Sequence, residues 1–547
     1  MIARKLVPPI VALGAGCMIA LAWEGSGQGK EKQDRQKKIP PGAYYSSGSC
    51  YECHNKPQSY QDKFIPNICR CNEFEIWETT DKHRLAFLAL KGKRADMMRE
   101  RLGYDVRAAK ACVSCHSVWI EDNQVREKQQ SLVEEGVSCF VCHGPDSGTD
   151  KRWMDTHGST NPATRDEWRK ESRETKQTRY GMRDLWNPAE RSRLCVSCHI
   201  GNADEDKIVT HEMYAAGHPP LPSFDMSNFS EAMKHWQALG EKSPAVLKEF
   251  KYSPLEVERE QLDLVTIGSL VSFQQTMVLL KKQASKLDAW PEFAQFDCYA
   301  CHHDLKNPSW RQQRGYRGKP GRPQMSAWPT ALMEVAVEYA SGADAKAAKR
   351  NFKDFEAKLA KLQDAFNAQP FGDTAKIADA TDELVQFIEK QIKVLQALPV
   401  VDESVHRRLL MKLIEKQNPT YLDHESARQV AGAFRAIYTD GWKNAKRDNE
   451  VMSHLTTLDD ELCLTFKSGA RKKFDAVRFG ITKELAKQRK ENPADINNFL
   501  DLKSGLLQNN YTAELNAHLE KINEYDPTKF KEKMNNIAKL LFKKEQP

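Results

Sequence analysis

The chain has 547 residues and a formal net charge of +7, with 40% hydrophobic and 29% charged residues. This length is enough for two or three domains with buried cores. The positive charge is spread over a large chain and accompanies no RNA- or DNA-binding motif, so the composition argues against a nucleic-acid-binding protein.

Residues 1–22 are typical of a secretory signal peptide. Two basic residues precede an apolar run, which ends in the cleavage site Ala20-Leu21-Ala22. We expect cleavage after Ala22, with an uncleaved membrane anchor as the alternative, so membrane contact depends on a retained signal. Residues 23–47 are rich in Gly, Lys and Gln and predict a flexible linker. The protein is therefore expected in the periplasm or an equivalent extracytoplasmic compartment.

The sequence Cys-x-x-Cys-His occurs five times in the segment that follows. It is the attachment sequence of c-type haem, in which two thiols form thioethers with the porphyrin and the adjacent imidazole binds the iron as its proximal ligand. A zinc site or a thioredoxin-like redox pair would not repeat with His after every second Cys. The motifs therefore predict five covalently bound haem c groups. The thioether cysteines are Cys50, Cys53, Cys112, Cys115, Cys139, Cys142, Cys195, Cys198, Cys298 and Cys301. The proximal histidines are His54, His116, His143, His199 and His302.

Each iron also has a face opposite its proximal ligand, and further histidines lie near the motifs. His211 and His218 are seven residues apart, which places them on one side of a short helix about two turns apart, within reach of two neighbouring irons. His303 directly follows a proximal histidine and points away from it, so it could bind a different haem. His235 is a sixth possibility. The distal candidates are His83, His157, His211, His218 and His303.

The remaining sequence predicts mainly helices. Residues 255–287 read as one long helix with basic residues at its end, and residues 306–326 form a basic, Gly- and Pro-containing linker. In residues 327–547 apolar side chains recur at helical spacing, as in Phe352, Phe355, Leu359, Leu362 and Phe366. The expected fold is mainly α: a multihaem cytochrome c domain with little regular structure over residues 48–305, followed by a haem-free helical bundle over 327–547.

The haem region resembles the tetrahaem cytochrome c-554 family, whose members are relatives of hydroxylamine oxidoreductase. The most specific part is Glu135-Gly-Val-Ser-Cys139-Phe-Val-Cys-His143-Gly-Pro145, and the likeness covers roughly residues 48–220. The resemblance implies an α-rich fold, haems stacked in close pairs, and electron shuttling from a periplasmic enzyme. It also implies that His83 and His157 are distal ligands and that the second haem, held by His116, is five-coordinate.

The chain departs from this family in three ways. It has a fifth haem motif, additional histidines at positions 211, 218 and 303, and a long helical extension. Those histidines could close the sixth position of the second haem, which puts an open site at His116 in doubt.

Two functions follow from these features. The first is electron transfer between a protein donor and a protein acceptor, for which bis-histidine haems are suited because no ligand exchanges at the iron. The second is an enzyme that acts on a small nitrogen oxide or hydroxylamine at one five-coordinate haem, which would need acid–base groups that the sequence does not locate. The helical domain could serve as support, for oligomerisation or for partner docking.

Overall fold

The computed structural model describes eleven segments of the chain and four single residues. The segments are residues 44–55, 71–121, 130–146, 152–236, 244–249, 259–309, 318–398, 403–415, 423–441, 449–462 and 525–542, and the single residues are 69, 126, 251 and 312. The predicted signal peptide and most of the linker 23–47 lie outside them. Within the described segments every regular element is a helix, apart from one bridge between Asn202 and Lys207. The expectation of a mainly α fold is confirmed.

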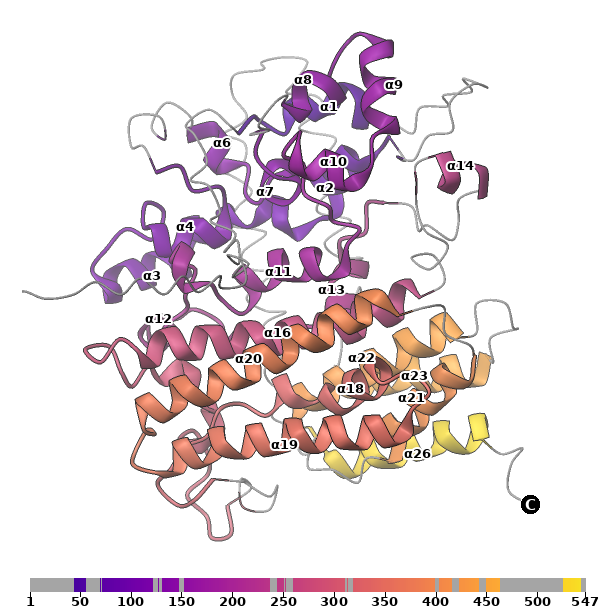
Figure 1. Ribbon diagram of the computed structural model, residues 1–547. Helices are drawn as coiled ribbons and strands as arrows, with labels where there is room; N and C mark the ends of the chain where they lie inside the picture. The colour runs from indigo at the N-terminus through magenta and orange to yellow at the C-terminus, as the bar shows by residue number, and fades with distance from the viewer. Residues whose placement is uncertain are drawn as a thin grey trace, which may run out of the picture. The chain divides into compact units, whose positions relative to one another are not determined.

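The N-terminal half consists of short helices joined by long connections (Figure 1). They are α1 (Gly48–His54), α2 (Glu73–Thr80), η1 (Lys82–Leu85), η2 (Phe87–Lys91), α3 (Lys93–Leu102), α4 (Lys110–His116), α6 (Gln130–Glu134), α7 (Cys139–His143), α8 (Trp153–His157), α9 (Pro162–Lys170), α10 (Arg173–Thr178), α11 (Pro188–His199), η3 (Ala203–Glu205), α12 (His211–Ala216), α13 (Met226–Ala232) and α14 (Pro244–Glu249). Most of their buried apolar side chains form small separate clusters, of which Phe140, Trp153, Trp168 and Tyr180 make up one, whereas those of α11 and α13 belong to the core of the longer helices.

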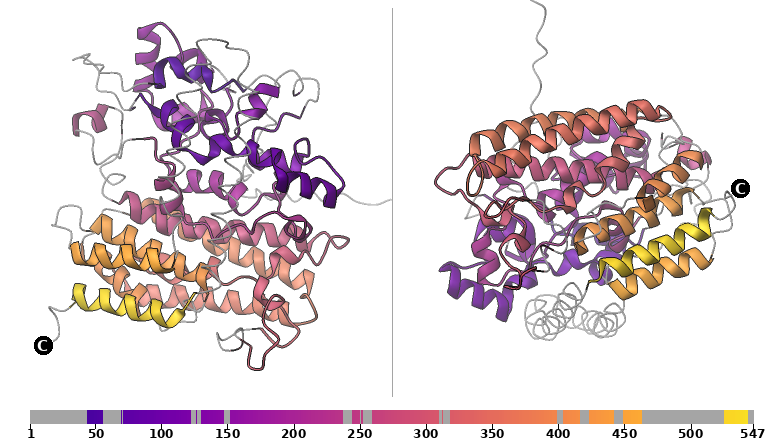
Figure 2. Two further views of the ribbon diagram at one scale, coloured as in Figure 1. Left: turned by 180° about the vertical axis from the view of Figure 1, so that it is seen from behind. Right: turned by 90° about the horizontal axis from the view of Figure 1, so that it is seen from below.

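The C-terminal half consists of longer helices. They are α16 (Glu260–Ala284), η5 (Phe293–Gln295), η6 (Cys298–Ala300), η7 (Trp328–Thr330), α18 (Met333–Ala340), α19 (Ala345–Asn367), α20 (Thr374–Ala397), α21 (Glu403–Glu415), α22 (His424–Gly441), α23 (Asn449–Leu462) and α26 (Pro527–Phe542). The described part of residues 327–547 is thus a helical bundle, as predicted. The last helix, α26, packs beside α23 (Figure 2).

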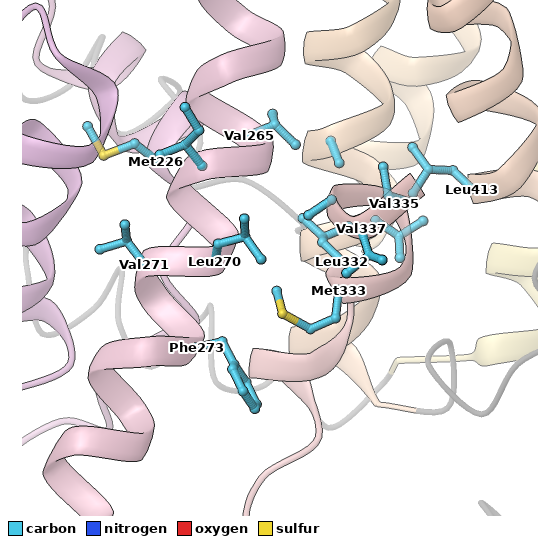
Figure 3. Packing of buried hydrophobic residues seen from close by; sticks show 14 of the residues in the cluster. Met226, Val265, Leu270, Val271, Phe273, Leu332, Met333, Val335, Val337 and Leu413 are labelled. Carbon is cyan, nitrogen blue, oxygen red and sulfur yellow. The ribbon is translucent and has the colours of Figure 1, made fainter. Parts of the chain in front are cut away.

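Helix α16 is the centre of this bundle and contacts α11, α13, α18, α20 and α22. Its side chains Val265, Leu270 and Phe273 face a cluster that includes Met333 of α18 and Leu413 of α21 (Figure 3). α16 is long and apolar enough to cross a membrane, but 72% of its most apolar window is buried inside the protein. That burial is the pattern of a core helix, because its apolar surface is already covered by other helices.

One hydrophobic core joins the haem-motif region to the bundle. Helix α11 ends in the fourth Cys-x-x-Cys-His motif, and its Ala189 and Val196 are fully buried in the same cluster as α16, α20 and α22. Residues 48–305 and 327–547, expected as two domains, therefore share this core.

The predicted helix over residues 255–287 corresponds to α16, which begins at Glu260 and ends at Ala284. Lys281 and Lys282 lie in its last turn, where positive charge is favourable near the helix C-terminus. The helix expected to carry both His211 and His218 is shorter than predicted. α12 ends at Ala216 because Gly217 adopts φ +125, so His218 lies just beyond the helix.

Candidate haem centres

Four of the five Cys-x-x-Cys-His motifs lie at the C-terminal end of a helix whose last residue is the motif histidine: α1, α4, α7 and α11. The fifth begins the short helix η6. Two cysteines three residues apart lie on one side of a helical turn, so both thiols of a motif are presented toward the same side. In α11 this turn is anchored upstream, where the Asn187 side chain caps the helix and Pro188 occupies its first turn.

Each motif histidine has the ring of a second histidine opposite it. The distances between ring centroids are 5.8 Å for His54 and His157, 6.4 Å for His116 and His218, 6.3 Å for His143 and His235, 6.2 Å for His199 and His83, and 6.3 Å for His302 and His211. The members of each pair are far apart in the sequence, and the fold brings them together.

This spacing fits one metal ion between the two rings of each pair. An imidazole nitrogen binds a metal at about 2 Å and the ring centre lies about 1.1 Å behind it, so two imidazoles across one metal have centroids roughly 6 Å apart. Direct stacking of two rings would allow a closer approach. The residues present therefore fit haem iron, which the two histidines of each pair would hold.

The second histidine of each pair lies at or beside the end of a short helix. His157 is the last residue of α8, His211 is the first of α12, and His83 is the second residue of η1, two positions after the capping residue Asp81. His235 follows α13, and its Nδ1 lies 3.1 Å from the carbonyl oxygen of Met233. Helix ends suit this role because the chain changes direction there and can aim a ring inward.

The α12 region provides second histidines for two different motifs. The backbone N–H of His211 donates to Glu292 at 2.8 Å, which ties α12 to the chain preceding the fifth motif. Gly217 brings the backbone close to α3, since a Cβ at this position would lie 2.5 Å from Cε of Met97. His218 follows directly and faces His116. The seven-residue separation thus reaches two motifs, as the sequence suggested, but across a helix end and not along one helix.

Several of these histidines have a defined partner at Nδ1. The acceptors are Glu73 for His54 at 2.8 Å, Asp81 for His83 at 3.0 Å, the Ala86 carbonyl for His116 at 2.7 Å and the Pro219 carbonyl for His218 at 2.7 Å. An imidazole that donates from Nδ1 presents the lone pair of Nε2, the atom that binds a metal.

Burial favours the neutral ring at several of these positions. It lowers the pKa of His143, His157 and His199 to about 3 and that of His218 to about 4. At His83 burial also acts to lower the pKa, but the hydrogen bond to Asp81 and the negative charges of Asp81 and Cys198 together outweigh it, and the pKa is raised.

Gly136 and Val137 hold the backbone of His83 against the third motif. The Val137 N–H donates to the His83 carbonyl at 2.9 Å, and Trp77 of α2 donates from its indole to the Val137 carbonyl at 3.0 Å. Gly136 has φ +79, and a Cβ there would lie 2.6 Å from the His83 carbonyl oxygen. The Gly-Val pair before Cys139 therefore has a structural reason: only glycine permits this approach.

The motifs adjoin one another through their cysteines. The thiols of Cys50 and Cys139 are in hydrogen-bonding contact, as are those of Cys115 and Cys198. Burial raises the pKa of the Cys142 thiol, and the nearby Cys195 adds to this rise. Motif one thus neighbours motif three, motif three neighbours motif four, and motif four neighbours motif two.

The fifth distal candidate from the sequence, His303, has a different environment. Its Nδ1 lies 2.7 Å from the carbonyl oxygen of the following residue, Asp304. In the described segments the ring that faces His143 is that of His235, the sixth possibility. His235 gave only a weak sequence signal because nothing local distinguishes it from an ordinary surface histidine.

The comparison with known protein families agrees with these features. Residues 49–144, which contain the first three motifs, match the model of the family cytochrome c554 and c-prime. No curated protein and no solved structure matches the chain. The match over residues 49–144, with the haem-attachment motifs in that segment and the mainly α fold, supports a multihaem cytochrome similar to cytochrome c554.

Proposed function

We propose that the protein is a pentahaem electron carrier that transfers electrons between a protein donor and a protein acceptor outside the cytoplasm. One observation carries the proposal: each of the five motif histidines faces a second histidine at the spacing of two axial ligands. Haem iron, when bound, would supply one-electron chemistry by alternating between its ferric and ferrous states.

The ligand sets follow from the ring pairs. His54 with His157, His116 with His218, His143 with His235, His199 with His83 and His302 with His211 would hold the five irons. His235 takes the place that the sequence left to His303. Two histidines per iron would leave no position for a substrate, so the polypeptide would bind and orient its cofactors without supplying an open site.

The enzyme alternative depends on a five-coordinate haem, which the family likeness places at His116. In this chain the ring of His218 lies 6.4 Å from that of His116 and is held by its own hydrogen bond to Pro219. The geometry therefore favours the electron carrier over the enzyme.

The haem motifs contact one another in a row, and exposed motif cysteines lie in the first and fifth motifs, at its two ends. Motif two neighbours the fifth through the α12 region, so the order of contact is five, two, four, three, one. Cys53 of the first motif and Cys298 and Cys301 of the fifth are exposed, whereas Cys112 of the second is buried. Partner proteins are therefore expected to dock near the first and fifth motifs. The N-terminal signal and the need to attach haem outside the cytoplasm support an extracytoplasmic location.

The test is spectroscopy of the purified, exported protein, after mass spectrometry has counted the haem adducts. We expect five adducts, only low-spin ferric haem in spin-resonance spectra, and no binding of carbon monoxide by the reduced protein. A high-spin haem that binds carbon monoxide in the unaltered protein would contradict the proposal and favour the enzyme.

A further inference from the structure

Helix α2 carries a carboxylate at each end, and each carboxylate contacts a different candidate ligand. At its start, Oε2 of Glu73 lies 2.8 Å from Nδ1 of His54. Directly after its last residue, Oδ1 of Asp81 lies 3.0 Å from Nδ1 of His83 and also accepts the backbone N–H of His83 at 3.0 Å. The side chains of Glu73 and Asp81 are only 19% and 5% exposed.

Other candidate ligands have an uncharged hydrogen-bond acceptor at Nδ1. His116 and His218, the two rings at the second motif, lie 2.7 Å from the backbone carbonyls of Ala86 and Pro219. His235, at the third motif, lies 3.1 Å from the Met233 carbonyl. A carbonyl oxygen carries only a partial negative charge, whereas a carboxylate carries a full one.

The position of α2 is fixed by buried contacts. Phe74 and Trp77 are buried, and the Trp77 indole donates to Val137, the residue two before Cys139. The two carboxylates are therefore held at their histidines by the fold, and not by a mobile surface chain.

We propose that Glu73 and Asp81 are positioning residues that lower the reduction potentials of the first and fourth haems relative to the second. The inference rests on the proposed ligation by His54 and His83. A carboxylate that accepts from Nδ1 pulls the proton toward itself and makes the imidazole a stronger electron donor. The stronger donor stabilises ferric over ferrous iron, which lowers the potential.

The test uses substitutions that keep the hydrogen bond but remove the charge. In Glu73→Gln and in Asp81→Asn the amide oxygen still accepts from Nδ1. We expect each change to raise the midpoint potential of one haem in a spectroscopically monitored redox titration, with the other four unchanged. Glu73→Ala, which removes the acceptor, should raise the same potential further.

Glu75→Gln is the matched control, because it removes the same charge from the same helix at an exposed position. Its titration should superimpose on that of the unaltered protein. A Glu73→Gln or Asp81→Asn protein with five low-spin haems and unchanged potentials would overturn the inference. Loss of one low-spin haem in these variants would also overturn it, since the carboxylate would then only hold the ring in place.

A second measurement needs no variant. Near-infrared magnetic circular dichroism of the oxidised protein reports how strongly each histidine pair donates to its iron. We expect the bands of two haems to be shifted relative to the others toward the position typical of imidazolate ligands. Five coincident bands would overturn the inference. Failure of the proposed function can be told apart from failure of this inference, because it would appear as high-spin haem in the unaltered protein before any potential is compared.

Discussion

At the scale of single residues, the assignment of His235 in place of His303 can be tested directly. His235 faces His143 at 6.3 Å, whereas Nδ1 of His303 lies against its own neighbour's carbonyl. Replacing His235 with Ala should open one axial position and produce one high-spin, carbon monoxide-binding haem out of five. His303→Ala is the matched control and should leave all haems low-spin. The opposite pattern would show that the sequence ranking of the two residues was right.

Gly136 provides a second prediction at this scale. Gly136→Ala should destabilise the protein, because a side chain at positive φ costs about 1–3 kcal/mol, and here the Cβ also meets the His83 carbonyl at 2.6 Å. Gly103 has a similar φ of +76 with no atom within 4 Å of its Cβ position, so Gly103→Ala should cost only the backbone strain. Denaturant unfolding measures both changes. Equal losses in the two variants would contradict the close approach at His83.

At the scale of elements, the start of α16 is held by a buried group of charges. Arg259 lies 3.0 Å from Asp263 and donates to the Leu398 carbonyl at the end of α20, while Asp440 near the end of α22 accepts the Leu262 N–H at 2.7 Å. The group thus ties three helices of the bundle together.

Arg259→Ala should be strongly destabilising. Removing one partner of a buried ion pair leaves an uncompensated charge, which costs about 3–5 kcal/mol. Denaturant unfolding followed by far-ultraviolet circular dichroism would measure this loss. Arg350→Ala, at an exposed position of α19, is a suitable control, because its ion pair with Asp344 is long, at 4.0 Å, and largely exposed. Similar stabilities of the two variants would show that the buried group contributes little.

The same buried group of charges is expected to make the stability of the protein depend on pH. Burial raises the pKa of Asp263 to about 7, against the attraction of Arg259 and with repulsion from Asp440 adding to it. Between the ordinary Asp pKa of about 4 and that raised value, the folded protein binds more protons at this residue than the unfolded chain does, so this contribution to stability falls as pH rises. The measurement is the free energy of unfolding at pH 4.5 and at pH 8. We expect this free energy to fall less between the two pH values in Asp263→Asn than in the unaltered protein. An unchanged slope would refute the assignment.

At the scale of the whole molecule, the shared core predicts how the described parts unfold. Leu270 of α16 is fully buried in the core that also contains Val196, three residues before the fourth motif's histidine. Leu270→Ala should cost about 2–5 kcal/mol, and it should lower the midpoints of helix loss and of the haem absorption change together. Leu287→Ala, at a position that is 73% exposed, should change neither. Separate transitions would indicate two independent domains.

The sequence by itself determined the local chemistry of this protein. The two thiols and the histidine of each motif lie within five residues, so their joint role could be deduced from spacing alone. The helical character of the described part of residues 327–547 was also readable, because apolar periodicity is a local pattern. The family match of residues 49–144 supports this interpretation of the first three motifs.

The tertiary structure decided what lies opposite each motif histidine and where the domains meet. The second histidine of a pair comes from a distant segment, as His83 does for His199. Adjacency to a motif favoured His303 over His235, whereas the ring that faces His143 is that of His235. The linker at 306–326 suggested a division, but apolar side chains of α11 and α16 pack with the bundle in one core. Contacts of this kind depend on how helices pack in three dimensions, and helix packing is set by surfaces assembled from residues far apart in the chain.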